Sequence, residues 1–223
     1  MSELKVNKLT GITGTSAGAP ITLSGDTATL GTGSTIGSGV TGTLGSGITF
    51  PAGHVVQTVV DNDDTTFSNT SVSGNVGNEV ALSKAYSVTP SGTSNKILVQ
   101  YAIPQVSMKS NVGGLFMRIY RKIGAGSYAH LTEASGDGTG TPNAAYAGNY
   151  DNQGDGNRSS WWMGGHFTDR THGQNGVELS YKFYFGVGDS GTHSIQVNRS
   201  TNDNNATYNF RTKTHVVLQE IKG

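Results

Sequence analysis

The amino-acid sequence predicts an all-β protein in two parts: an extended Gly/Thr/Ser-rich N-terminal arm or shaft, and a C-terminal β-sandwich knob with jelly-roll character. Three observations predict this fold class. The composition changes sharply near Pro51, short runs of β-branched and aromatic residues follow that point, and no stretch of the 223 residues has the capped amphipathic pattern of a helix. We therefore divide the chain into residues 1–50 and residues 51–223.

The first part has too few large apolar side chains to form a core of its own. Residues 1–50 contain 11 Gly, 11 Thr and 6 Ser, but only one aromatic residue. One bulky apolar residue recurs every four positions: Ile36, Val40, Leu44 and Ile48. This spacing is too sparse for an isolated strand, and the glycine content disfavours a helix. Composition alone leaves a disordered linker open. If the arm is ordered, it must bury these groups, most simply against copies of itself around a symmetry axis.

The second part reads as a series of strands separated by turn signals. Eight runs are rich in β-branched and aromatic residues: 54–60, 79–88, 95–103, 115–123, 160–167, 177–187, 193–199 and 208–221. Alternation is clearest in 177–187, where Leu179, Tyr181 and Phe183 share one face while Ser180 and Lys182 share the other. Eight or nine strands in a domain of this length predict a sandwich or jelly roll.

Charge and composition exclude several classes of function. The formal net charge is zero and charged residues are 13% of the chain, against about 25% in an ordinary soluble domain. A neutral chain lacks the electrostatic field on which nucleic-acid binding relies. We expect no membrane insertion, because no apolar run is long enough to span a bilayer. Cysteine is absent, so disulfides, thiolate metal sites and cysteine nucleophiles are excluded.

Motifs that match enzymes by letter lack the structure that the chemistry requires. Residues 14–18 fit a nucleophile elbow and residues 37–42 fit a dinucleotide fingerprint. Both need a buried strand before the motif and a helix after it, and neither is expected here. The pair His166 and His172 has no standard zinc spacing, and the calcium-like run from Asp151 has Trp162 where the bidentate Glu belongs. We expect no catalytic residue, metal or cofactor.

Two further groups of charged residues remain without a clear pattern. The thirteen carboxylates of residues 51–223 include no pair that the spacing selects for glycoside cleavage, so a small depolymerase is a minor alternative. The basic cluster Arg118, Arg121 and Lys122 is interpreted as solvated charge at a sheet edge.

The candidate ligand-binding segment runs from Thr132 to Ser160 and into the two tryptophans. A connection of this length is uncommon in a compact domain unless it binds something or is disordered. It is rich in planar amides, carboxylates and aromatic rings, the side chains that recognise sugar hydroxyls and pyranose faces. The candidate residues are Tyr146, Asn149, Tyr150, Asp151, Asn157, Arg158, Trp161 and Trp162. The alternative is a polar surface loop with one tryptophan in the core, because consecutive strand residues point to opposite faces.

Both ends of the chain resemble one group of proteins. Four segments carry this resemblance: the opening MSELKVNKLTGITGT, the Gly/Thr repeat, the hinge ITFPAGHVVQ and the ending VNRSTNDNNATYNFRTKTHVVLQEIKG. They are similar to the tail-fibre-like appendage proteins of marine tailed phages, the cyanophages and their relatives. The resemblance implies a virion protein with an N-terminal attachment segment, a glycine-rich stem and a β-jelly-roll knob that is usually a homotrimer. Residues 61–176 share only the general pattern, and no receptor site carries over.

The expected function is therefore host attachment by a virion appendage. Its expected partners are two further copies of the chain, other virion proteins through residues 1–20, and a host surface polysaccharide. Weak contacts would be multiplied by several copies on each particle. The alternative is a purely structural virion protein, a head decoration or an adaptor, that binds no receptor.

Overall fold

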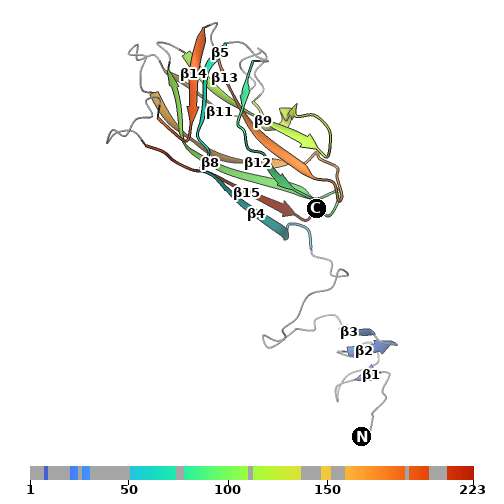
Figure 1. Cartoon of the computed structure of the whole chain (residues 1–223). Coiled ribbons are helices and arrows are strands. Elements are labelled where there is room, and N and C mark those ends of the chain that lie inside the picture. The colour runs from blue at the N-terminus through green and yellow to red at the C-terminus, as the bar shows by residue number, and fades with distance from the viewer. Residues whose placement is uncertain are drawn as a thin grey trace. The chain divides into compact units, whose positions relative to one another are not determined.

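In the computed structural model the chain forms two compact units, residues 1–49 and residues 50–223. The boundary lies beside the composition change at Pro51. The structure describes residues 8–9, 21–24, 27–30, 51–73, 78–109, 113–136, 147–151, 159–188, 191–200 and 210–223. Figure 1 shows the strands of both units.

The first unit contains a small antiparallel sheet. Its strands are β1 (Lys8–Leu9), β2 (Ile21–Ser24) and β3 (Thr27–Leu30), in the order β1-β2-β3. The repeat of residues 36–48, and all of the expected anchor in residues 1–20 except β1, lie outside the described residues.

One sheet of the second unit is built around its longest strand. This β8 sheet contains β4 (Val55–Asp63), β5 (Phe67–Ser73), β8 (Lys96–Lys109), β12 (Ser159–Asp169), β14 (Thr192–Val197) and β15 (Thr214–Ile221). All its strand pairs are antiparallel. Strand β8 pairs with β12, and it also pairs with β15 over residues 96–102 and with β14 over residues 106–109.

The other sheet is built around β9 and β13. This β9 sheet contains β6 (Val80–Ala81), β7 (Tyr86–Val88), β9 (Gly113–Ile123), β10 (Ala129–His130), β11 (Ala147–Asp151) and β13 (Leu179–Val187). Strand β9 pairs with β13 over nine residues, and it also pairs with β10 and β11. A 3₁₀ turn, η2 (Thr132–Ala134), follows β10.

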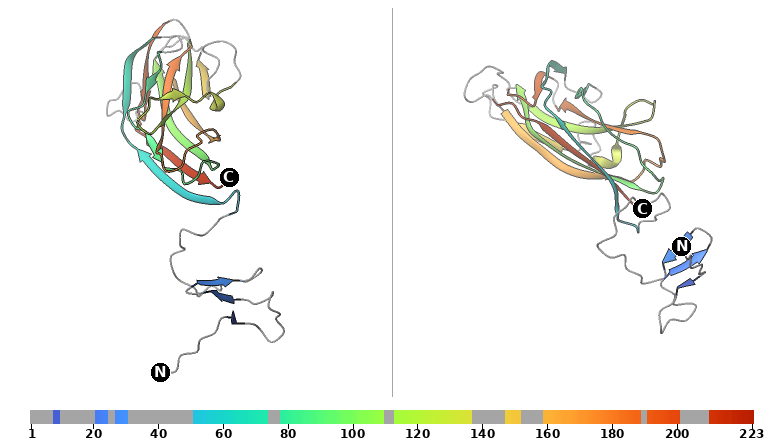
Figure 2. Two further views of the ribbon diagram at one scale, coloured as in Figure 1. Left: turned by 90° about the vertical axis from the view of Figure 1, so that its right-hand side faces the viewer. Right: turned by 60° about the horizontal axis from the view of Figure 1, so that its bottom comes forward.

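The two sheets pack face to face around one core, which confirms the expected all-β sandwich. Strand β13 contributes Leu179, Phe183 and Phe185, and β8 contributes Ile97 and Ile103, all fully buried. Figure 2 shows the sheets as two layers from two further directions. In the part of the chain that the structure describes, no helix is long and apolar enough to cross a membrane.

Two of the expected runs form strands that are shorter than the sequence predicted. The run 79–88 forms two short strands, because the chain bulges between Ala81 and Tyr86 while both strands pair with β13. The bulge brings Lys84 within 2.7 Å of the Asp61 carboxylate on β4 in the other sheet. In the run 208–221, of which the structure describes residues 210–221, the regular strand begins at Thr214. Strand β5 was not expected, since its sequence FSNTSVS is mostly polar.

A buried asparagine organises the place where the β8 sheet forks into β14 and β15. Asn198 follows β14 with a positive φ of 61° and is 1% exposed. Its Nδ2 donates to the carbonyl of Asp63 at 3.0 Å, and its Oδ1 accepts from the Thr214 hydroxyl at 3.0 Å. Its backbone N–H donates to the Gln105 carbonyl. These bonds satisfy polar groups that would otherwise be buried without partners.

The expectation that Arg118 and Arg121 are solvated edge charges is wrong. Strand β9 has strands on both sides, so it is not an edge strand of its sheet. Arg118 is 4% exposed and forms an ion pair with Glu79. Arg121 points into the sandwich and pairs with the fully buried Asp169 of β12. Both partners are distant in sequence, so the local pattern could not reveal them.

Candidate functional site

The outer face of the β9 sheet carries aromatic and basic side chains on neighbouring strands. On β9 and β13 the core-facing positions are apolar, apart from Arg121, so the alternate positions point away from the core. The register sets Tyr120 opposite Lys182, Lys122 opposite Ser180, and Arg118 opposite Tyr184. The outward residues of the two strands therefore form one continuous surface.

Two tyrosines from adjacent strands stack at the centre of this surface. Tyr120 of β9 and Tyr184 of β13 are diagonal neighbours, and their ring centroids are 3.9 Å apart with an interplanar angle of 29°. Diagonal cross-strand neighbours are within reach of aromatic side chains. The His130 ring of β10 lies beside Tyr120, with the centroids 5.5 Å apart, because β10 pairs His130 with Tyr120.

A third tyrosine lies close to two lysines on the same surface. The ammonium groups of Lys122 and Lys182 lie 5.6 and 5.1 Å from the ring centroid of Tyr128, which follows the turn after β9. These distances are typical of cation–π contacts. We call the set Tyr120, Tyr128, Tyr184, Lys122 and Lys182 the tyrosine platform. Each of its side chains is partly exposed.

The hydroxyl groups of the platform remain protonated at neutral pH. Burial raises the pKa of Tyr120, Tyr128 and Tyr184. At Tyr128 a hydrogen bond with Ser180 partly opposes this effect of burial on the pKa. Burial, with the nearby Arg118 charge, lowers the pKa of His130. The platform therefore presents neutral hydrogen-bond donors beside aromatic faces and ammonium groups, a combination that suits sugar hydroxyls and pyranose C–H faces.

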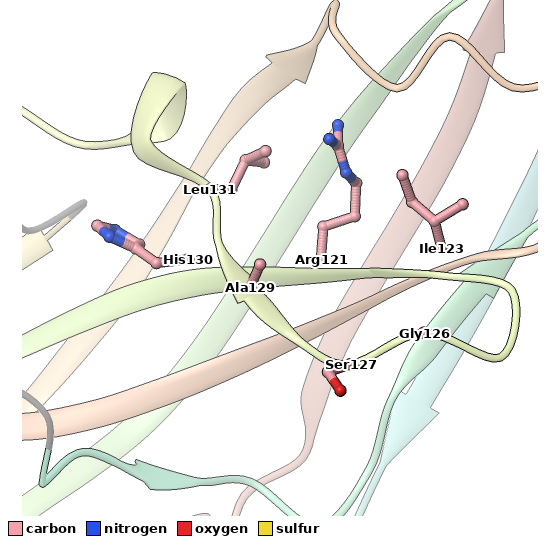
Figure 3. Close-up of a pocket in the computed structure, with 7 residues that line it drawn as sticks. All are labelled: Arg121, Ile123, Gly126, Ser127, Ala129, His130 and Leu131. Carbon is pink, nitrogen blue, oxygen red and sulfur yellow. The ribbon is translucent and has the colours of Figure 1, made fainter.

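A small pocket lies at the β9–β10 hairpin. Its volume is about 180 Å³, and it is lined by Arg121, Ile123, Gly126, Ser127, Ala129, His130 and Leu131. Figure 3 shows Arg121, Ile123 and Leu131 directed to the same side of the hairpin, whereas Ser127 points to the other. Because Arg121 and Ile123 alternate with Tyr120 and Lys122, they lie on the opposite face of β9 from the platform. Arg121 is neutralised by Asp169, so this pocket offers no free cation to an anionic ligand.

Two buried carboxylates, Asp169 and Glu220, serve the fold and are poorly suited to acid catalysis. Burial acts to raise the pKa of Asp169, but hydrogen bonds from Arg121 and Tyr181 outweigh it and hold the pKa below its usual range. Glu220 has a lowered pKa in the same way, because hydrogen bonds from Asn95, Gln57 and Ser91 outweigh its burial. A general acid needs the opposite shift. Among the described residues, no group of three or more acidic or histidine side chains is placed to hold a metal ion.

The structure distributes the candidate ligand segment between the two sheets. The backbone of Asn149, Tyr150 and Asp151 belongs to β11, which pairs with residues 113–115 of β9. Trp161 and Trp162 belong to β12 in the β8 sheet. Tyr146, Asn157 and Arg158 lie outside the described residues. The segment therefore contributes strand β11 to the sheet that carries the platform.

The two tryptophans point to opposite faces of β12, as their adjacency predicted. Trp161 packs against the core, whereas Trp162 is 65% exposed. The Trp162 ring lies over Gly164, the next residue on the same face of the strand. Trp162 is thus available to a ligand, on a different sheet from the platform.

Sequence reasoning did not identify the tyrosine platform. The sequence did show that four platform residues point away from the core. Tyr120 and Lys122 alternate with core residues in one expected strand, and Lys182 and Tyr184 do so in another. The missing information was that these two strands are neighbours, with Tyr120 opposite Lys182.

Comparison with known proteins gives matches only among solved structures. No protein-family model matches the sequence, and no curated protein matches it. A chain from the structure of the infectious bursal disease virus Gx strain matches with a TM-score of 0.32 and 13% identity, over 82% of this chain and 42% of that chain. A chain of the T13 particle of the same virus matches with a TM-score of 0.34 and 15% identity, over 82% and 40%.

A chain of the VP2 subviral particle of infectious bursal disease virus is a third match. Its TM-score is 0.29 and its identity 12%, over 76% of this chain and 38% of that chain. This chain thus spans less than half the length of the proteins it matches. TM-scores this low do not establish a common fold.

Proposed function

We propose that this chain is a structural protein of a virion, a tail-fibre-like appendage that attaches the particle to the surface of its host cell. The tyrosine platform is the observation that carries this proposal. Stacked Tyr120 and Tyr184, with Tyr128 close to two lysines, form a surface suited to a saccharide. The sequence resemblance to marine phage appendages supplies the virion location.

The two-unit organisation supports the same function. A glycine-rich first unit with little apolar content suits anchoring to other virion proteins through residues 1–20, and the sandwich unit presents the binding face. We propose a homotrimer, in which three platforms act together. Several weak sites on one particle raise the overall avidity by orders of magnitude, so each site need not bind tightly.

An array of bacterial surface polysaccharides, probed with the full-length protein, tests the proposal. We expect binding that falls at least about tenfold in Tyr184→Ala, because the stack with Tyr120 is lost, and that is largely kept in Tyr184→Phe. Circular dichroism and thermal unfolding of each variant show that it is folded. Loss of binding in Tyr184→Phe as well, with the fold retained, would identify the hydroxyl rather than the ring as the group in contact.

Trp162→Ala serves as the comparison, because this exposed aromatic residue lies on the other sheet. If Trp162→Ala abolishes binding and Tyr184→Ala does not, the ligand contacts the Trp162 side of the β8 sheet and the platform is not the site. If no polysaccharide binds the protein, and phage particles that lack it attach to cells normally, the attachment function is wrong.

A second candidate is a purely structural virion protein, a head decoration or an adaptor. Three large apolar side chains, Val60, Trp162 and Phe210, are 63–65% exposed. Exposed apolar groups of this kind suit contact with a neighbouring protein. Loss of particle stability on deletion of the protein, together with an absence of polysaccharide binding, would favour this candidate.

A further inference from the structure

Two lysine ammonium groups converge on one aromatic ring of the platform. Lys122 extends from β9, Lys182 from β13, and both approach the ring of Tyr128. Lys122 and Lys182 are on the same face because β9 and β13 pair in register, with Lys122 opposite Ser180 and Lys182 opposite Tyr120. The paired strands, rather than a loop, fix the backbone positions from which the two lysine side chains extend.

The other charges on this face do not cancel those of the two lysines. Arg118 is paired with Glu79. Glu178, exposed next to the start of β13, accepts a hydrogen bond from the Ser180 hydroxyl at 3.0 Å. Over the part of the chain that the structure describes, neither Lys122 nor Lys182 forms an ion pair. By contrast, Lys84 pairs with Asp61, and Lys213 pairs with Asp64. The two platform lysines therefore give this face a local excess of positive charge.

Aromatic rings alone do not distinguish acidic from neutral sugars, but ammonium groups beside them do. A pyranose ring over a tyrosine places its substituents at the edge of the ring. At Tyr128 two ammonium groups approach the ring. Ammonium groups form charge-assisted hydrogen bonds with carboxylate or sulfate oxygens. A neutral saccharide would leave both cations without a partner.

We propose that the tyrosine platform selects acidic polysaccharides, with Lys122 and Lys182 binding a carboxylate or sulfate substituent of a sugar that stacks on the tyrosines. This inference rests on the proposed attachment function and adds the chemical class of the ligand. Lys122 and Lys182 are the residues that determine specificity, and the tyrosines supply affinity for the sugar ring.

The test compares three polysaccharides with the full-length protein immobilised: alginate, which carries carboxylates; dextran sulfate, which carries sulfates; and dextran, which is neutral. We expect binding to one or both acidic polymers and little to dextran. Lys122→Gln and Lys182→Gln should each weaken acidic binding about tenfold, since each removes one charge-assisted contact. Added salt should weaken binding as it screens the charges.

Two variants control for a general effect of charge. Lys213→Gln removes the same charge far from the platform in sequence, at a side chain that is 59% exposed, and should leave binding unchanged. Glu178→Gln removes an exposed carboxylate just before β13, at a position of the same outward phase as Lys182, and should strengthen acidic binding. This opposite sign separates electrostatic selection from damage to the fold.

The outcomes separate this inference from the function on which it rests. Binding to dextran that is as strong as binding to the acidic polymers, and unchanged in Lys122→Gln and Lys182→Gln, overturns acidic selection but leaves attachment intact. Equal weakening by Lys213→Gln also overturns it, because the charge effect would then be non-specific. Binding to none of the three polymers overturns the inference, and attachment is then decided by the polysaccharide array and the particle assay. Preference for alginate over dextran sulfate, or the reverse, identifies the acidic group.

Discussion

The Arg121 guanidinium and the Asp169 carboxylate join the two sheets across the core. Arg121 Nη1 lies 2.6 Å from Asp169 Oδ1 and 2.7 Å from Oδ2. Arg121 belongs to β9 and Asp169 ends β12, so the pair connects the β9 sheet to the β8 sheet. Tyr181 donates a hydrogen bond to the same carboxylate at 2.7 Å. Breaking one partner of such a pair leaves the other charge buried without compensation.

Asp169→Asn should therefore destabilise the protein by about 3 kcal/mol, measured by urea unfolding. The control is Asp64→Asn at the exposed pair with Lys213, where the loss should stay below about 1 kcal/mol. The two side chains of that pair are 74% and 59% exposed. Equal losses for the two variants would show that the buried pair contributes no more than a surface pair.

Two buried tyrosines that face each other across β7 and β13 should respond differently to loss of their hydroxyl groups. Tyr181→Phe removes the donor to Asp169 and should cost about 1.5–3 kcal/mol, as expected for a hydrogen bond to a charged group. Tyr86→Phe should be neutral or slightly stabilising, because the Tyr86 hydroxyl is buried without a hydrogen-bond partner among the described residues. Thermal or urea unfolding measures both, and a larger cost for Tyr86→Phe would contradict this assignment.

Acidification should remove the stability that Glu220 contributes. Its side chain is fully buried and accepts hydrogen bonds from Gln57 Nε2 at 2.6 Å and from the Ser91 N–H at 2.7 Å. The pKa of Glu220 is lowered in the folded protein. Its contribution is therefore present above the unfolded pKa of about 4.3 and is lost as the pH falls through the lower folded pKa.

Glu220→Gln isolates this effect. The variant should be less stable than the parent at pH 7 by about 1–3 kcal/mol, because the donors lose a charged acceptor. The difference should shrink as the pH is lowered below about 4, where the parent's glutamate becomes protonated. Unfolding curves at several pH values measure it. A difference that stays constant from pH 7 to pH 3 would assign the loss to packing.

Two glycines covered by aromatic rings should tolerate alanine unequally. A Cβ at Gly186 would overlap the ring of Phe116, and a Cβ at Gly164 would overlap the ring of Trp162. Phe116 is 5% exposed, so its ring has little room to move, whereas Trp162 is 65% exposed and its ring can swing into solvent. Gly186→Ala should cost about 1–3 kcal/mol and Gly164→Ala less than about 1 kcal/mol.

The double variant Phe116→Ala/Gly186→Ala tests the cause. With the ring removed, the alanine at position 186 should add little further loss, which a double-mutant cycle measures as a coupling energy. Simple additivity of the two losses would show that the overlap with Phe116 is not the reason.

The strands that the sequence predicted well are those with an apolar face. In β13 the buried Leu179, Phe183 and Phe185 alternate with partly exposed Lys182 and Tyr184, and this alternation was visible without the structure. Strand β5 was not predicted because its sequence FSNTSVS is rich in serine, asparagine and threonine, which also occur in loops. Its strand character comes from pairing with β14, which is distant in sequence.

The site was harder to predict than the fold because it depends on which strands are neighbours. Tyr120 and Tyr184 are 64 residues apart in numbering, and only the pairing of β9 with β13 brings their rings to 3.9 Å. The same dependence explains why the ion pairs of Arg118 and Arg121 were not predicted. Their partners, Glu79 and Asp169, lie 39 and 48 residues away. Local patterns show which face of a strand a residue occupies, but they do not show its cross-strand neighbours.

The position of β15 between β4 and β8 has a consequence for biosynthesis. Strand β15 is the last strand along this chain, yet it pairs with the earlier β4 on one side and β8 on the other. A ribosome releases β4 and β8 long before residues 214–221 emerge, so neither strand has this partner during most of translation. The sandwich therefore closes only after β15 has emerged, and the glycine-rich first unit leaves the ribosome well before the second unit is complete. Until then the edges of β4 and β8 that β15 will cover stay open, and open strand edges are the ones that pair with other chains, so the sandwich is most exposed to aggregation just before β15 emerges.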